Sequence, residues 1–127
     1  MEKSGLDRSR KGQTGLRRIW NALFNTVDGI KAALWHEAAF RQEVLLAAVL
    51  IPVALTFSVG AAGKAMMIAS ILLVLVVELL NSALEAAVDR VSLDRHELSK
   101  RAKDLGSAAV FLSLANVVVV WALVLFG

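Results

Sequence analysis

The chain has 127 residues, of which 57% are hydrophobic and 20% are charged, with a formal net charge of +3 and no cysteine. This length predicts a single domain, and the apolar fraction exceeds the roughly half that is usual for soluble proteins. The basic residues flank hydrophobic runs, which favours an integral membrane protein and excludes a nucleic-acid-binding one, and the lack of cysteine excludes disulfides and thiolate metal sites.

The N-terminal part combines a polar segment with an amphipathic one. Residues 1–17 are rich in glycine, serine and charge, so we predict a mobile tail. No apolar stretch follows its basic residues directly, so we expect no cleaved signal peptide. Apolar residues then recur every three or four positions, which predicts a helix over residues 18–38. Trp20, Trp35 and the basic flank favour a helix lying in the headgroup plane of a membrane, and packing on a soluble partner is the alternative.

Three apolar runs follow this helix. Each run is long enough, with the residues at its ends, for a helix to cross the hydrocarbon core of a bilayer. The only proline, Pro52, lies inside the first run, where a membrane helix tolerates it. The expected fold is an all-α membrane protein, with a surface helix and three transmembrane helices per chain forming a helical bundle in an oligomer. The predicted spans cover about residues 40–59, 65–88 and 105–126.

The segments between the spans differ in charge. Residues 60–63 contain only glycine and alanine and predict a tight turn. Residues 90–103 are highly charged and predict a connector, in which Ser92 or Asp94 would cap the third spanning helix. Lys64 is the one basic residue between the first two spans. The positive-inside rule therefore places the connector and the N-terminus in the cytoplasm and the C-terminus outside.

The second span contains polar side chains that lie on one helical stripe. Four of them are spaced three, four and four residues apart, with Ser82 beside them. An ionised carboxylate in a bilayer costs roughly 2.5 to 3.5 kcal/mol on insertion scales, so it must face protein, water, a cation or a proton. A stripe that only joins helices is the alternative for Asn81 and Ser82. The two glutamates favour a catalytic or ligand-binding role for the stripe, because helix packing does not require acid groups. The four stripe residues are Glu78, Asn81, Glu85 and Asp89.

Charged residues from several predicted elements are expected at one level, the cytoplasmic interface. Their carboxylates suit Mg²⁺ and their cations suit phosphates. Glu78 lies about 10 Å deeper than Glu85 along the second span. A metal-phosphate site in water, beside a carboxylate on the lipid side, is what phosphoryl transfer to a lipid alcohol requires. Neither a P-loop nor a protein-kinase signature is present. The residues at this level include Glu37, Glu43, Glu85, Asp89, Lys100, Arg101 and Lys103.

Three stretches resemble the small integral-membrane diacylglycerol kinases of bacteria. They are EAAFRQE at 37–43, VELLNSALEAAVDR at 77–90 and HELSKRAKDLGSAAV at 96–110. The resemblance extends from about Arg18 to Trp121. It implies ATP-dependent phosphorylation of diacylglycerol to phosphatidic acid, with Mg²⁺ as cofactor. It also implies a homotrimer in the bacterial inner membrane, with active sites between subunits.

The resemblance also implies roles for individual residues. Glu78 would be the general base that takes the proton of the lipid hydroxyl, and Glu37 and Glu85 would be the metal ligands on ATP. Residues expected to bind ATP are Arg18, Asn25, Glu37, Glu85, Asp94, Arg95, His96, Lys103 and Asp104. Residues expected at the lipid site or in support of it are Arg41, Glu43, Asn81, Asp89, Ser107 and Trp121.

Simpler explanations exist for some of these residues. Lys103 and Asp104 are adjacent, so they point about 100° apart and need not touch. His96 is explained by a contact with solvent or backbone, because no second histidine lies nearby on its segment. Trp121 is explained as an interface anchor or as bundle packing.

Other functions are also compatible with parts of the sequence. Undecaprenol kinases share the scaffold, although the stretch at 37–43 favours the diacylglycerol branch. In a different class, Glu78, Asn81 and Glu85 would line the pore of a small oligomeric proton or cation pathway. That reading gives no role to the basic cluster or to the amphipathic helix. An accessory membrane subunit accounts for the composition only.

Overall fold

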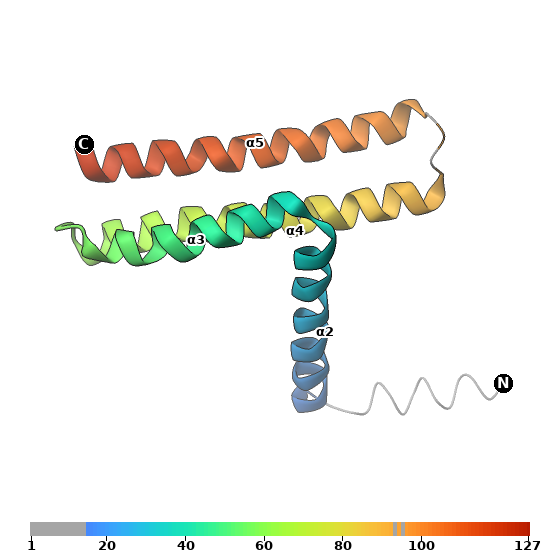
Figure 1. Cartoon of the computed structure of the whole chain (residues 1–127), viewed down its shortest axis with the longest axis horizontal. Helices are drawn as coiled ribbons and strands as arrows, with labels where there is room; N and C mark the ends of the chain where they lie inside the picture. The colour runs from blue at the N-terminus through green and yellow to red at the C-terminus, as the bar shows by residue number, and fades with distance from the viewer. Residues whose placement is uncertain (1–14, 93, 95) are drawn as a thin grey trace.

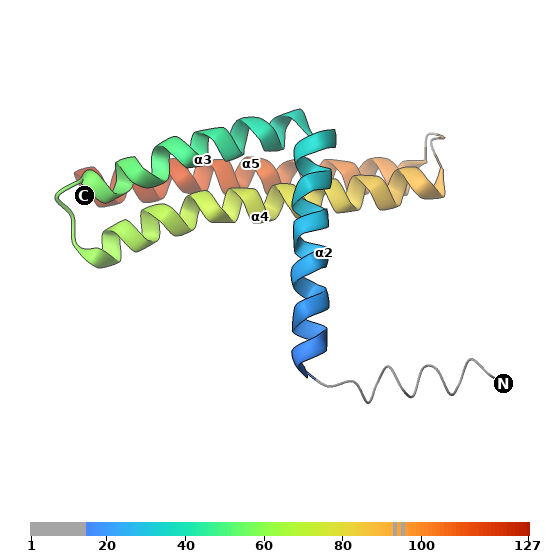
Figure 2. The ribbon, with the colours of Figure 1, turned by 60° about the horizontal axis from the view of Figure 1, so that its bottom comes forward.

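The computed structural model describes residues 15–92, 94 and 96–127, and this part of the chain is built from four helices (Figure 1). Three of them are long and apolar enough to cross a membrane. They run side by side, whereas the first helix leaves the bundle at a steep angle (Figures 1 and 2). The predicted all-α membrane architecture is therefore confirmed. The helices are α2 (Gly15–His36), α3 (Ala38–Thr56), α4 (Ala61–Val91) and α5 (Glu97–Phe126).

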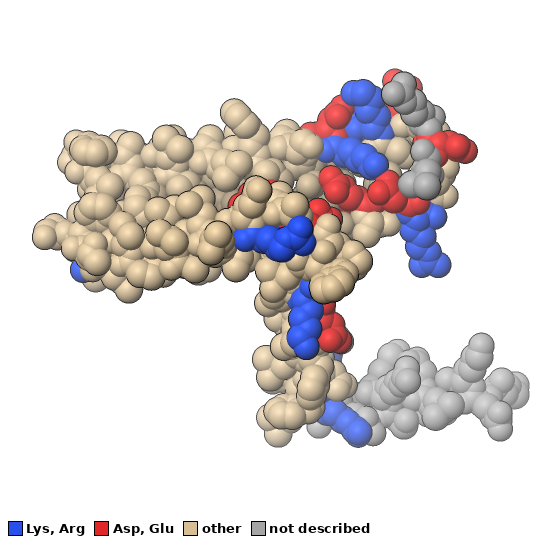
Figure 3. All heavy atoms as spheres, in the orientation of Figure 1, with Lys and Arg blue, Asp and Glu red and all other residues tan. Residues whose placement is uncertain are grey.

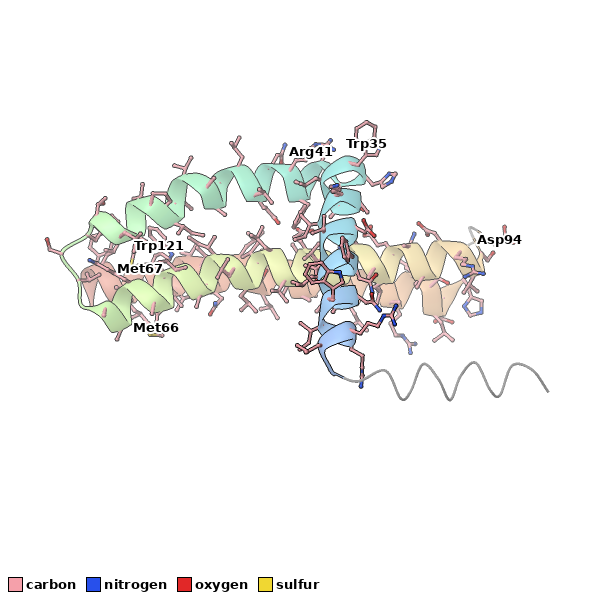
Figure 4. All side chains as sticks on the ribbon, turned by 90° about the horizontal axis from the view of Figure 1, so that it is seen from below. Trp35, Arg41, Met66, Met67, Asp94 and Trp121 are labelled. Carbon is pink, nitrogen blue, oxygen red and sulfur yellow. The ribbon has the colours of Figure 1, made fainter. Side chains whose placement is uncertain are left out.

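Helix α2 is amphipathic and separates from α3 at a single residue. It begins three residues before its predicted start and ends at His36. Glu37 then has an extended backbone, with φ of −116° and ψ of 105°, which redirects the chain. The Arg41 guanidinium donates hydrogen bonds to the carbonyl oxygens of Leu34, at 2.8 Å, and Trp35, at 3.0 Å. Arg41 thus satisfies two of the free carbonyls at the end of α2, beside Trp35 (Figure 4).

Helix α4 is the centre of the bundle, because it contacts each of the other three helices. Its buried residues recur every three or four positions, as expected for one face of a helix. On α3 the buried positions are seven residues apart, and two of them are alanines that allow close approach. The buried set consists of Phe40, Ala47 and Ala54 on α3 and Met67, Ser70, Ile71, Val74 and Glu78 on α4.

Helices α4 and α5 are longer than a bilayer requires. Their 31 and 30 residues correspond to about 46 and 45 Å, against about 30 Å for a hydrocarbon core. The predicted glycine-alanine turn was too long, because α4 already begins at Ala61. The predicted connector was also too long, because α5 begins at Glu97 and includes Lys100 and Lys103. Alanine, lysine, arginine and glutamate are good helix formers, so the helices extend beyond the apolar stretches.

The prediction of the N-cap of α5 was wrong. The cap is His96, whose Nδ1 accepts a hydrogen bond from the backbone N–H of Leu98 at 3.1 Å. Ser92 instead ends α4, and its Oγ accepts from the N–H of Asp94 at 3.0 Å. His96 directly precedes α5, because the connector between α4 and α5 is short. It is therefore the residue in position to cap α5. The backbone contact predicted for His96 is confirmed.

Trp121 joins α5 to α4 at the bundle end opposite the connector (Figure 4). Its indole Nε1 donates to the carbonyl oxygen of Met67 at 3.2 Å, and its ring meets Phe57 edge to face at 6.3 Å between centroids. We expect Trp121→Phe to lower the free energy of unfolding by about 1 kcal/mol, because the interhelical hydrogen bond is lost while an aromatic ring remains. Thermal unfolding in detergent would measure this change. Trp20→Phe, on the exposed face of α2, is the control, and equal unfolding midpoints for the two variants would contradict the bonding role.

Candidate active site

The polar stripe of α4 continues the buried apolar stripe of the same helix. In the isolated chain Glu78 is only 7% exposed. Its carboxyl group therefore points into the bundle and not outward toward acyl chains. Asn81 and Glu85 follow at helical spacing and are half-buried. The stripe runs through Met67, Ile71, Val74, Glu78, Asn81 and Glu85.

A second acid group lies beside Glu78. Glu43 of α3 lies close enough to Glu78 for their carboxyl groups to interact. Its Oε2 atom is buried and has no hydrogen-bond partner among the described residues. The α3–α4 contact thus brings two acid groups together at one end of the buried apolar stripe.

Asn81 lies between Glu78 and the charged end of the bundle. Its Nδ2 donates to Glu85 Oε1 at 3.5 Å, a long contact. Its Oδ1 is buried without a hydrogen-bond partner in the part of the chain that the structure describes. Gly106 of α5 lies directly against this oxygen. The Asn81 carboxamide is therefore fixed between a carboxylate and a neighbouring helix.

Charged side chains gather where α4 ends and α5 begins (Figure 3). Lys103 pairs with Asp89 across the two helices at 2.8 Å, and Lys100 pairs with Asp104 along α5 at 2.7 Å. Lys103 precedes the apolar part of α5, and its hydrogen bond to Asp89 raises the pKa of the Lys103 ammonium group above its usual value. As predicted, the neighbours Lys103 and Asp104 point to different partners. Exposed pairs like these add little stability, so both cations stay free to meet an anion.

An open cleft of about 510 Å³ occupies this charged end. It lies between the last turn of α4, the connector and the first turns of α5. Asp94, at the end of the bundle in Figure 4, is on its rim. The cleft combines two lysines, which can contact phosphates, with four carboxylates, which can bind cations, and with serine hydroxyls. Its lining includes Asp89, Ser92, Asp94, His96, Glu97, Ser99, Lys100, Lys103 and Asp104.

A second, mainly apolar groove of about 560 Å³ lies where α2 crosses α4. Glu37 is at its polar end, and Leu79, Ser82 and Ala86 of α4 form its floor. The crossing is therefore within about two turns of Glu78. The crossing sets the position along α4 at which α2 lies beside the polar stripe.

The structure brings together only some of the predicted site residues within one chain. Glu78, Asn81, Glu85 and Asp89 form one stripe, which meets the cleft that contains Lys103. Arg18 and Asn25 lie on the part of α2 that projects away from the bundle. Arg18 is about 22 Å along the helix from Ala33, the buried residue of α2.

Three further predicted residues, Arg41, Ser107 and Trp121, lie apart from the stripe. Arg41 caps α2, and Ser107 is exposed on α5. Trp121 is about 22 Å along α5 from Gly106. Arg95 lies outside the described residues. Among residues 15–92, 94 and 96–127, no three histidine or acidic side chains form a group that could hold a metal ion.

The sequence interpretation missed Gly106 as a neighbour of Asn81, and missed Glu97 and Ser99 in the cleft. Glycine inside a helix was the available signal for Gly106, because glycine is a poor helix former. The cleft residues had no such signal. They are identified only by the packing of α5 on α4.

A buried acid on a membrane-spanning helix, whose polar stripe runs on to a charged cleft at the end of the bundle, is the arrangement expected of an integral-membrane enzyme. The model of the family "Prokaryotic diacylglycerol kinase" matches residues 25–125. The chain belongs to the prokaryotic diacylglycerol kinase family.

Relatives named diacylglycerol kinase match nearly the whole chain. That of Pseudomonas aeruginosa is 60% identical, over 92% of this chain and 95% of the relative. That of Haemophilus influenzae is 50% identical, over 89% and 96%, and that of Escherichia coli K12 is 43% identical, over 90% and 93%. This membership favours a lipid kinase over a proton or cation pathway.

Proposed function

We propose that the chain transfers the terminal phosphate of ATP to the free hydroxyl of diacylglycerol, giving phosphatidic acid and ADP. The observation that supports this most directly is the stripe on α4 that runs from the buried Glu78 to Asp89 in the charged cleft. It provides a buried acid group and, about three helical turns farther along α4, a charged cleft that begins at Asp89. A family match alone would not supply this geometry.

In the proposed reaction, the oxygen of the lipid hydroxyl bonds to the γ-phosphorus of ATP while Glu78 accepts the hydroxyl proton. The bond from that phosphorus to the bridging oxygen of ADP breaks. Phosphoryl transfer depends mainly on alignment and on charge neutralisation, so no covalent protein intermediate is required. Glu43, in contact with Glu78, offers a second acceptor through which the proton can leave.

The nucleotide is proposed to occupy the charged cleft. Lys103 pairs with Asp89 across the two helices, which places its ammonium group near the polar stripe. Lys100 and the connector residues Asp94 and His96 form the rest of the rim. These groups can bind and orient phosphates and ribose hydroxyls. Glu85, one helical turn from Asp89, would face the phosphates of the bound nucleotide.

Glu37 and Glu85 are the residues proposed to hold Mg²⁺. Their donor chemistry fits, because Mg²⁺ binds oxygen ligands and usually takes only one or two protein carboxylates beside waters and phosphates. When bound, Mg²⁺ would neutralise phosphate charge during the transfer. Glu37 ends the crossing groove and Glu85 lies on the neighbouring face of α4, so each reaches the site from a different element.

We further propose that the site is shared between copies in a homotrimer, with the N-terminus in the cytoplasm and the C-terminus outside. Arg18 and Asn25 project away from their own cleft, which supports contact with a neighbouring copy. Large apolar side chains also remain exposed along α3 and α5. The mass of the detergent-solubilised particle, corrected for bound detergent, tests the trimer, and a monomer that is fully active would contradict the shared site.

The test of function is a side-by-side assay of the purified protein in detergent micelles with Mg²⁺ and γ-labelled ATP. We expect labelled phosphatidic acid from diacylglycerol, and a lower kcat/KM with undecaprenol. The ordering is expected because the stretch at 37–43 resembles the diacylglycerol branch. Labelling of undecaprenol alone would assign the chain to the undecaprenol kinases. Labelling of neither alcohol would overturn the kinase assignment.

A further inference from the structure

Asn81 of α4 and Gly106 of α5 lie directly against each other where the two helices pack. A Cβ atom built on Gly106 would overlap Asn81 Oδ1 and lie 3.3 Å from its Cγ. The carboxamide oxygen thus occupies the space that any other residue at position 106 would need. The oxygen is buried and accepts no hydrogen bond within the described residues. It is held in place by shape and not by a bond.

This contact fixes the other end of the Asn81 side chain. With its oxygen against Gly106, the amide Nδ2 is aimed along α4 at Glu85 Oε1, 3.5 Å away. Asn81 is also one helical turn from Glu78. A methyl group at position 106 would rotate or displace the carboxamide, because a side chain yields more easily than two packed backbones. The amide would then move relative to Glu85 and Glu78.

Helix propensity gives glycine no advantage at this position. Gly106 lies inside α5, where alanine is the better helix former. Glycine at position 106 is explained by the space that its missing side chain leaves for the Asn81 oxygen. We propose that Gly106 is a positioning residue of the active site: its missing side chain sets the orientation of Asn81, and through Asn81 it aligns Glu85 and the phosphate with Glu78. This inference rests on the proposed kinase function.

The chain provides a matched control at the other end of the same helix pair. A Cβ on Gly63 would meet Val124 Cγ1 at 3.0 Å, so Gly63→Ala also adds one methyl group to the α4–α5 interface. Gly63 is about 22 Å along α4 from Glu78. A general loosening of the helix pair would affect both alanine variants. A positioning effect belongs to Gly106→Ala alone.

The experiment measures kcat and the KM values for Mg·ATP and diacylglycerol, in the full chain, for wild type, Gly106→Ala, Gly63→Ala, Asn81→Ala and the double variant Asn81→Ala/Gly106→Ala. We expect Gly106→Ala to lower kcat on the order of 100-fold, as a displacement of about 1 Å can do, with the KM for diacylglycerol within about threefold. Gly63→Ala should retain kcat within about threefold. In the Asn81→Ala background, Gly106→Ala should change kcat less than about twofold, because the group it displaces is absent.

Two results would overturn the inference while leaving the kinase intact. One is an active Gly106→Ala variant beside an impaired Asn81→Ala variant. The other is an equal loss from Gly106→Ala in both backgrounds. If Gly106→Ala alone does not fold, Asn81→Ala/Gly106→Ala should recover folded protein by size-exclusion chromatography, and failure to do so also overturns it. An inactive wild type would instead contradict the proposed function.

Discussion

Glu78→Gln should lower kcat by roughly 10²- to 10⁴-fold, the range that a positioned general base contributes. The amide has nearly the same shape as the acid but cannot accept the proton of the lipid hydroxyl. Because Glu78 is buried in the bundle, away from the cleft that holds the charged residues, the KM for Mg·ATP should change little. Steady-state kinetics with diacylglycerol in micelles gives both values.

A control for this variant is Asp28→Asn, which removes an exposed carboxylate from α2. It changes the net charge in the same direction without touching the stripe, so wild-type kcat is expected. Equal turnover in the wild type and in Glu78→Gln would remove Glu78 from the base role. In that case the second carboxyl of the pair, on Glu43, would be the next group to test.

Glu85→Gln should act on the nucleotide side as well as on turnover. We expect the Mg·ATP concentration for half-maximal activity to rise roughly tenfold or more, because a charge-assisted contact to the metal-nucleotide is lost. The glutamine still offers an oxygen to Asn81 Nδ2, so the substitution isolates the charge from the packing. Titrations with MgCl₂ at fixed ATP, and with ATP at fixed MgCl₂, measure the effect.

A comparison of Glu78→Gln with Glu85→Gln separates the role of proton acceptor from that of metal ligand. Glu78→Gln should change mainly kcat, whereas Glu85→Gln should change both kcat and the Mg·ATP requirement. An unchanged magnesium titration for Glu85→Gln would exclude this residue as a metal ligand. Glu37→Gln would then show whether the remaining proposed ligand acts alone.

Most of the helical architecture was predictable, because it depends on local patterns. The three spans follow from apolar length, and the orientation of Glu78 follows from its three- and four-residue spacing to the buried positions of α4. The ends of the helices were less predictable. Ala61 and Glu97 already belong to helices, because helix propensity continues where hydropathy stops.

The sequence by itself determined that acids lie on one face of the second span and that cations follow it, since helical periodicity is a property of neighbouring residues. Only the tertiary structure decided which groups meet across helices. Asp89 pairs with Lys103, Glu43 approaches Glu78, and the Asn81 oxygen fills the space at Gly106. These contacts join residues 14 to 35 positions apart, and their geometry depends on how α3 and α5 pack against α4. No local pattern encodes that packing.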